Sequence, residues 1–134
     1  MDFVLKDQKP NLVADGFDLL VQEGELEDSD LLSRKLSCIR QRLVASPAYI
    51  AQHGAPENLG ELRRHQAIVN APRQVTWGFN AAHGIAFVKV PWRLSVPTTI
   101  AVADAARHGL GLALLPEFIA DRLTITGSLV VCPP

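Results

Sequence analysis

The sequence predicts an α/β protein, in which helices cross between the strands of a sheet. The clearest indication is residues 93–116, RLSVPTTIAVADAARHGLGLALLP, which read as strand, helix, glycine turn and strand. Within it, residues 110–115 form a nearly continuous apolar run, which is typical of a strand covered on both faces. A helix that crosses between two strands in this span forms a β-α-β unit, where ligands bind beyond the carboxyl ends of the strands.

The signals at the ends of this helix are specific. Thr98 or Thr99 can cap its start, because a hydroxyl there accepts a hydrogen bond from a free backbone N–H. Gly109 stands where a helix commonly ends in a left-handed residue, and Pro116 is well placed as the first residue of another helix. We expect that second helix at residues 117–122. Small apolar residues predict the face that lies on the sheet: Ile100, Ala103 and Ala106.

The chain before this unit also alternates between strand and helix patterns. Residues 2–6 and 17–21 read as strands around one or two helical turns at 10–15, and residues 31–46 read as a long strand. Ser46, followed by proline, predicts an N-cap for a helix that Gly54 ends. Asn58 and Glu61 form a weak capping box for a helix that runs to Arg64.

Shorter strands are expected in the second half of the chain. Residues 66–70, 75–79 and 85–90 fit this pattern, and the last two form a hairpin through residues 80–84. Residues 129–132 would be a final strand. Four aromatic residues fall at alternating strand positions, which favours core packing over a ligand cage: Trp77, Phe79, Phe87 and Trp92.

Composition excludes several classes of protein. The 134 residues favour one domain or part of one, and the 48% apolar content suffices for a core. A formal net charge of −1 argues against an independent nucleic-acid binder, which normally shows a basic excess. Because no apolar run could span a bilayer and no signal-peptide core is present, we expect a cytoplasmic protein without a membrane partner.

Motifs for catalysis are absent from the sequence. It contains no G-x-S-x-G, no P-loop and no H-E-x-x-H, and its paired glycines near residue 110 are too few for a dinucleotide fingerprint. Cys38 and Cys132 make neither a disulfide framework nor a complete zinc site, which favours inert thiols in a reducing compartment. We expect no cofactor, and we expect His65 at a helix end, facing free carbonyls. A metal site with Cys38 or Asp104 stays open as an alternative for the scattered histidines: His53, His65, His83 and His108.

Several segments follow one another in a recognisable order. They are VADGFDLL at residues 13–20, LLSRKL at 31–36, LVASPAYI at 43–50 with His53 and Gly54, residues 59–65 with Ile68, Trp77 with Phe79, and GLGLALLP at 109–116. In this order and spacing they resemble the effector-binding domain of LysR-type transcriptional regulators. The resemblance covers nearly the whole chain.

The resemblance implies a periplasmic-binding-protein-like fold of two lobes joined by two crossover strands, with a small effector in the cleft. Residues 1–43 would be the tail of lobe one with a crossover strand, and residues 44–134 most of lobe two. The family's helix-turn-helix, the first β-α-β-α part of lobe one, and the return strand with its closing helix have no counterpart here. We therefore expect no specific DNA binding by this chain.

The resemblance also implies four effector-binding residues. Gln22 stands where many members have an arginine at the end of a lobe-one strand. Glutamine, however, cannot form the charged, bidentate hydrogen bonds that arginine makes with a carboxylate. Ser46 lies at the crossover into lobe two. Thr98 and Thr99 lie at a helix N-terminus, which favours an anionic or polar small molecule. Simple capping is the alternative role of the threonines, and the two roles can coexist.

The function expected from this resemblance is effector sensing and dimerisation, without catalysis. Residues 117–122 lie on the helix that members use to pair effector domains, so a homo-oligomer is expected. One alternative is an interaction fragment that binds no effector, because uncovered sheet edges and apolar faces invite association. A small α/β enzyme is the remaining alternative.

Overall fold

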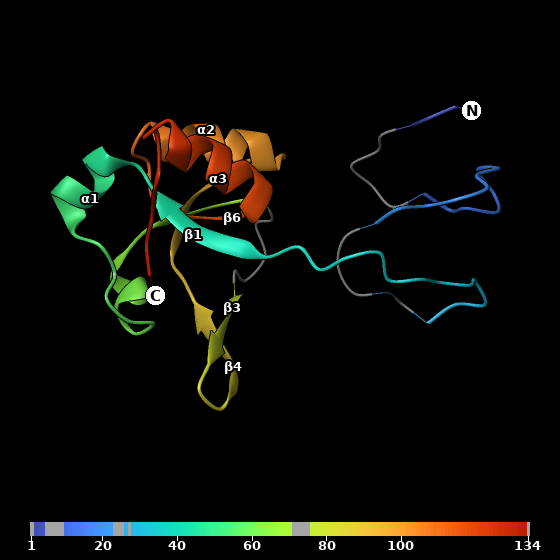
Figure 1. Ribbon diagram of the computed structural model, residues 1–134, viewed down its shortest axis with the longest axis horizontal. Coiled ribbons are helices and arrows are strands. Elements are labelled where there is room, and N and C mark those ends of the chain that lie inside the picture. Colours follow the sequence, from blue (N-terminus) through green and yellow to red (C-terminus); the bar gives the residue numbers. More distant parts are fainter. Residues whose placement is uncertain (1, 5–9, 23–25, 27, 71–75, 134) are drawn as a thin grey trace. The chain divides into compact units, whose positions relative to one another are not determined.

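The structure is a computed structural model that describes residues 2–4, 10–22, 26, 28–70 and 76–133 (Figure 1). It divides into two units, Met1–Leu36 and Ser37–Pro134. Every helix and strand of the described residues belongs to the second unit. The second unit therefore carries the core and each element discussed below.

In the first unit, residues 11–17 form a hydrogen-bonded turn. Asp15 N donates to Asn11 O at 2.8 Å and Phe17 N donates to Leu12 O at 2.9 Å, and Gly16 ends the turn with a φ of 70°. This turn replaces the helical turns expected at residues 10–15.

Of the strands expected in the first part of the chain, the long one at residues 31–46 is confirmed at its end, as the strand Gln41–Ala45, and the others are wrong where the structure describes them. Residues 17–21 and 31–40 form no strand, nor do residues 2–4, while residues 5 and 6 of that expected strand lie outside the described residues. The physical reason is that a strand needs a neighbour for its backbone groups and a cover for its apolar face. Leu19 and Val21 lack this cover, since their side chains are 77% and 65% exposed.

The sheet of the second unit is built around β1 (Gln41–Ala45). Its two neighbours, both antiparallel, are β6 (Ala113–Pro116) and β7 (Val130–Val131). The register pairs Gln41 with Pro116 and Val44 with Ala113. The final strand expected at residues 129–132 is thus present in shortened form.

A parallel pair of strands extends this sheet. β2 (Ala67–Val69) pairs with β5 (Trp92–Ser95) in parallel, and Ala67 forms a parallel bridge with Leu112 just before β6. Ile68 N donates to Leu112 O at 2.8 Å, and Leu112 N donates to Gln66 O at 2.9 Å. Through this bridge the strands follow one another in the order β5-β2-β6-β1-β7.

The predicted β-α-β unit is confirmed as β5, α2 (Thr99–Arg107) and β6, with β2 between the two strands. Figure 1 shows α2 and α3 (Glu117–Ile125) together on one side of β1 and β6. Val102, Ala103 and Ala106 of α2 are buried there, whereas Ile100, which we expected on this face, is 70% exposed. Val102 takes its place in the packed face.

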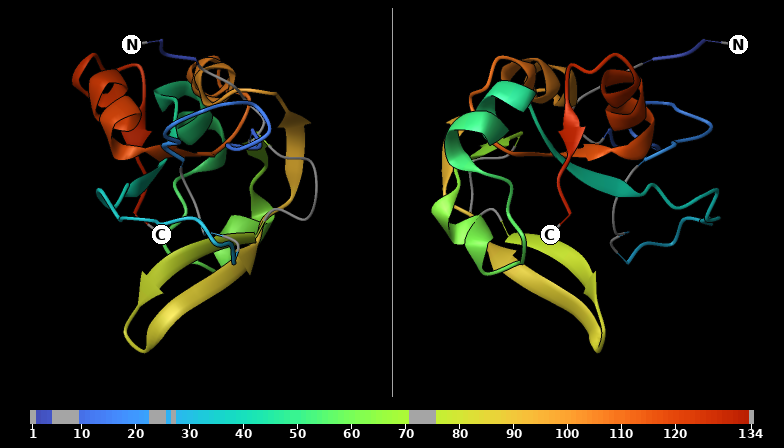
Figure 2. Two further views of the ribbon diagram at one scale, coloured as in Figure 1. Left: turned by 90° about the vertical axis from the view of Figure 1, so that its right-hand side faces the viewer. Right: turned by 60° about the vertical axis from the view of Figure 1, so that its left-hand side comes forward.

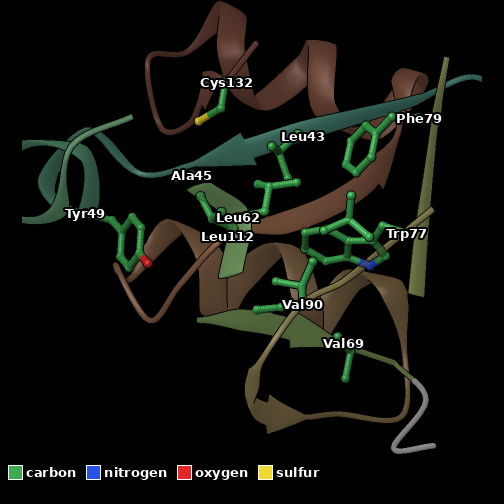
Figure 3. Packing of buried hydrophobic residues seen from close by; sticks show 12 residues of the cluster. Leu43, Ala45, Tyr49, Leu62, Val69, Trp77, Phe79, Val90, Leu112 and Cys132 are labelled. Atoms are coloured by element: carbon green, nitrogen blue, oxygen red, sulfur yellow. The ribbon is translucent and has the colours of Figure 1, made fainter. Parts of the chain in front are cut away.

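The opposite face of the sheet holds a second buried cluster (Figure 3). It lies against α1 (Pro47–His53), the 3-10 helix η1 (Glu61–Arg64), β3 (Thr76–Ala81) and β4 (Gly84–Lys89). Along β1, Leu43 and Ala45 belong to this cluster, and Val44 belongs to the cluster under the helices. The prediction that the strand ending at Pro116 is covered on both faces is confirmed by the same alternation, with Leu112 in one cluster and Ala113 in the other.

The predicted hairpin is confirmed as β3 and β4, which extend away from the helices in both views of Figure 2. Trp77 and Phe79 are buried on its inner face, as expected for core packing. For Phe87 and Trp92 that expectation is wrong, because they are 71% and 44% exposed. Phe87 lies opposite Gly78 in the register, and strand alternation turns this pair to the outer face.

The helix ends largely follow the sequence signals. Ser46 caps α1, which ends at Gly54 with a φ of 77°. Pro116 is the N-cap of α3 rather than its first residue, and α3 continues to Ile125. The capping box is incomplete: Asn58 Oδ1 accepts from Glu61 N, but the Glu61 carboxylate accepts from Glu57 N.

Candidate functional site

The carboxyl ends of the parallel strands meet at one edge of the sheet. β2 and β5 run in the same direction. The chain entering β6 also runs in this direction, because Leu112 forms a parallel bridge with Ala67 of β2. Val96 N donates to Val69 O at 2.9 Å, so the end of β2 lies beside the segment that leads into α2. We call this side of the sheet the carboxyl edge. In β-α-β folds it is the edge at which ligands bind.

Thr98 and Thr99 lie at this carboxyl edge. Thr98 has an extended backbone, with φ −131° and ψ 150°, and its hydroxyl accepts from Ala101 N at 3.2 Å. The capping role of Thr98 is thus present. The first turn of α2 contains no acidic residue, so no carboxylate of that turn neutralises the positive end of the helix dipole.

Ser46 lies at the opposite edge of the sheet. It follows β1, which runs antiparallel to β6, so it lies far from the edge where α2 begins. Its side chain is 2% exposed, and its hydroxyl accepts from Tyr49 N at 3.1 Å. The structure thus gives Ser46 a buried capping role and does not bring it together with Thr98 and Thr99.

Gln22 belongs to the first unit, where its side chain is partly buried. The expected strand before it is absent, so Gln22 does not stand at the end of a strand. Of the three predicted effector-binding residues in the second unit, Thr98 and Thr99 lie together and Ser46 lies apart from them.

An ion-pair cluster that the sequence did not reveal lies at the carboxyl edge. Arg42 of β1 forms an ion pair with Glu117 and a second one with Asp121, the latter at 2.9 Å between Nε and Oδ1. Glu117 N also donates to Arg40 O at 2.8 Å. These contacts tie the start of α3 to the segment that enters β1. The sequence alone could not reveal these ion pairs, because they join residues far apart in the chain.

Two buried ring side chains lie at the edge opposite to Thr98. Tyr49 of α1 places its hydroxyl 3.1 Å from Nδ1 of His65, which follows η1 as expected for a histidine at a helix end. Burial lowers the pKa of His65, the neighbouring His53 lowers it further, and Glu61 opposes this change. Burial also raises the pKa of Tyr49.

The cysteines differ in their surroundings. Cys38 is exposed, whereas Cys132 is buried, and burial raises the pKa of its thiol to about 11. Over the ranges that the structure describes, no three His, Cys, Asp or Glu side chains lie close enough to hold a metal ion. The metal-site alternative therefore has no ligand set within these ranges. Within the same ranges, no helix has the length and apolar character needed to cross a membrane.

Comparisons with known proteins agree with one another. The family model described as LysR substrate binding domain matches residues 3–134. An uncharacterized HTH-type transcriptional regulator of Haemophilus influenzae is 32% identical over 130 residues, which cover 96% of this chain and 45% of that protein. The HTH-type transcriptional regulator CrgA of Neisseria meningitidis serogroup C is 33% identical over 126 residues, which cover 90% of this chain and 40% of CrgA.

A solved structure supports the same relationship. The structure of CrgA, a LysR-type transcriptional regulator from Neisseria meningitidis, matches with a TM-score of 0.76 at 29% identity. The match covers 90% of this chain and 42% of the CrgA chain. The chain therefore spans less than half the length of the relatives it matches. The expected periplasmic-binding-protein-like α/β fold is confirmed by this likeness.

Proposed function

Because the chain belongs to the LysR substrate-binding domain family, whose members regulate transcription and are not enzymes, we propose that it senses a small effector for such a regulator. The observation that carries the proposal is the position of Thr98 and Thr99. Both residues lie at the start of α2, on the carboxyl edge of the parallel strands. A ligand at this edge can contact hydroxyls and backbone N–H groups together.

The ligand we propose is a small anion such as a carboxylate. The N-terminus of a helix favours negative charge, and the first turn of α2 has no carboxylate of its own to compete. The hydroxyl of Thr98 is engaged by Ala101 N, but its oxygen retains a hydrogen for donation. Thr99, the first residue of α2, supplies the second hydroxyl. Gln22 would contact the ligand from lobe one, and Ser46 would act only by holding α1 in place.

Regulation would follow from a change in the arrangement of the lobes. We assign residues 1–43 to lobe one and residues 44–134 to lobe two, and place the effector between them. A ligand shifts the equilibrium between two arrangements of the lobes only if it binds one arrangement more tightly than the other. DNA contact would come from another part of the regulator, and α3 would take part in pairing two copies in the cytoplasm.

The test is thermal unfolding of the chain with benzoate, salicylate, acetate and malonate, each added in separate experiments. A ligand at a hundred times its dissociation constant stabilises the fold by about 2.7 kcal/mol, which raises the midpoint by a few degrees. Thr99→Val should reduce this rise while leaving the ligand-free midpoint nearly unchanged. Thr76→Val, an exposed threonine on β3, is the matched control and should keep the full rise.

Two results would contradict the proposal. If none of the acids raises the midpoint, a small carboxylate is not the ligand class. If an acid raises the midpoint equally in the wild-type chain and in Thr99→Val, the hydroxyl of Thr99 is not part of the site.

A second candidate function, association without an effector, is favoured by one observation. The described residues of the first unit expose large apolar side chains, among them Leu32 at 104% and Leu36 at 75%. Such surface usually marks an interface. Sedimentation at increasing concentration tests this candidate, and a strictly monomeric chain would contradict it.

A further inference from the structure

A buried hydrogen-bond chain joins α1 to the start of β2. The hydroxyl of Tyr49 lies 3.1 Å from Nδ1 of His65 and accepts from Gln66 N at 3.3 Å. The Tyr49 and His65 side chains are only 3% and 6% exposed. Tyr49 is also part of the buried cluster in Figure 3, so this polar contact lies at the margin of an apolar core.

The donors and acceptors of this chain suit a neutral His65. A backbone N–H can only donate, so the oxygen of Tyr49 accepts from Gln66. The phenol hydrogen stays available for Nδ1 of His65, 3.1 Å away. The neutral tautomer that carries its proton on Nε2 can accept this hydrogen at Nδ1. A protonated His65 would instead present a second donor to Tyr49, and the phenol hydrogen would lose its acceptor.

We propose that Tyr49 and His65 form a proton-operated latch, which holds α1 against the entry of β2 at neutral pH and releases it in mild acid. The latch is a property of this chain alone and requires no effector. It lies at the edge of the sheet opposite to Thr98, so it is separate from the proposed ligand site.

The surrounding charged groups favour the neutral imidazole. His53 on α1 lies with its ring centroid 4.5 Å from that of Tyr49, and its charge lowers the pKa of His65 in addition to burial. Glu61 on η1 opposes this effect. Arg93 on β5 and Cys132 after β7 act on Tyr49, whose pKa stays raised because burial is the larger cause.

The direction of the pH effect follows from these observations. Because the pKa of His65 is lower in the folded chain, the unfolded chain binds more protons as the pH falls below about 6.5. Stability is thus complete above the unfolded pKa and is lost as the pH falls towards the folded pKa. Each unit of difference between the two pKa values changes the folding equilibrium about tenfold.

Loss of the contact between Tyr49 and His65 would affect the sheet through Gln66. Gln66 N donates to Tyr49, and Gln66 O accepts from Leu112 N at 2.9 Å. The same peptide segment therefore connects α1 to the bridge between β2 and β6. Loss of the Tyr49 contact would free α1 first and then weaken this bridge.

The test compares unfolding of the chain at about pH 7.5 and about pH 5, the range in which histidine titrates. His65→Gln removes the titrating group but keeps a side-chain acceptor for Tyr49. We expect the wild-type midpoint to fall in acid and the His65→Gln midpoint to fall much less. His83→Gln, in the exposed turn of the hairpin, is the matched control and should show the wild-type fall. An equal acid loss in wild type and His65→Gln would overturn the latch.

A second measurement keeps the proposal testable if His65→Gln does not fold. NMR titration of the wild-type chain should give His65 a pKa below the ordinary histidine value of about 6.5. Hydrogen exchange of the α1 amides should accelerate in acid beyond the intrinsic change. Tyr49→Phe, which lacks the phenol, should show the faster α1 exchange already at neutral pH. Unchanged α1 protection in acid, or a His65 pKa at or above about 6.5, would overturn the proposal.

Discussion

Gly111 passes so close to Gln66 that a β-carbon at Gly111 would lie 2.3 Å from the Gln66 carbonyl oxygen. This approach is what allows Leu112 N to reach Gln66 O at 2.9 Å and join β2 to the chain entering β6. The second glycine of the GLG sequence is therefore required by backbone packing, not by a ligand phosphate.

Gly111→Ala should destabilise the chain by about 1–3 kcal/mol, because the added methyl group meets a backbone atom that cannot move aside. Urea unfolding measures this loss. Gly127→Ala is the control, since its β-carbon would meet no atom within 4 Å and only its φ of 70° opposes the substitution. An equal loss in both variants would show that conformational freedom, and not the close approach, is what Gly111 provides.

Thr98→Ala should cost about 1 kcal/mol of stability, because the N–H of Ala101 loses its acceptor at the start of α2. Thr98→Ser retains a hydroxyl in the same position and should stay close to wild type. Thermal unfolding without any ligand separates this capping role from effector binding. A Thr98→Ser chain as unstable as Thr98→Ala would argue that the methyl group matters more than the hydroxyl.

Arg42→Gln should weaken the attachment of α3 to β1, because the carboxylates of Glu117 and Asp121 lose their shared cation. The Arg42 side chain is 38% exposed, so solvent screening limits the expected loss to about 0.5–1 kcal/mol. The loss should shrink at high salt. Arg107→Gln, which removes an exposed pair within α2, should have a smaller effect. Equal losses in the two variants would contradict a special role for Arg42.

The two cysteines should react with a thiol reagent at very different rates. Cys38 is exposed, whereas the Cys132 thiol is buried and has a pKa of about 11, so almost none of it is thiolate at neutral pH. We expect one fast equivalent of reaction in the folded chain and a second only after unfolding. Cys38→Ser should remove the fast phase. Fast reaction of both thiols would show that the buried cluster around Cys132 does not protect its thiol.

Much of the second unit could be predicted from local patterns. Ser46 and Thr98 cap their helices as expected, because an N-cap depends on a hydroxyl and the backbone within three residues. The hairpin followed from alternating apolar residues around a short turn. The side-chain directions were predicted less well, since Phe87 faces solvent opposite Gly78 and Ile100 of α2 is exposed.

The candidate site could be predicted only in part. Thr98 and Thr99 lie at the carboxyl edge as the β-α-β pattern implied. Ser46 could not be placed by the same reasoning, because its edge depends on whether β1 runs parallel or antiparallel to β6. The ion pairs from Arg42 to α3 were missed for a similar reason, because they join residues far apart in the chain, 75 positions in the case of Glu117.

The sequence by itself determined the α/β class, the caps of α1 and α2, the β5-α2-β6 crossover and the family to which the chain belongs. Each of these rests on interactions within a few residues or on motifs in a fixed order. Tertiary structure alone decided the strand order, the opposite edges of Ser46 and Thr98, and the absence of strands at residues 17–21 and 31–40. The physical reason is that a strand acquires its direction, and often its existence, from the neighbour that satisfies its backbone.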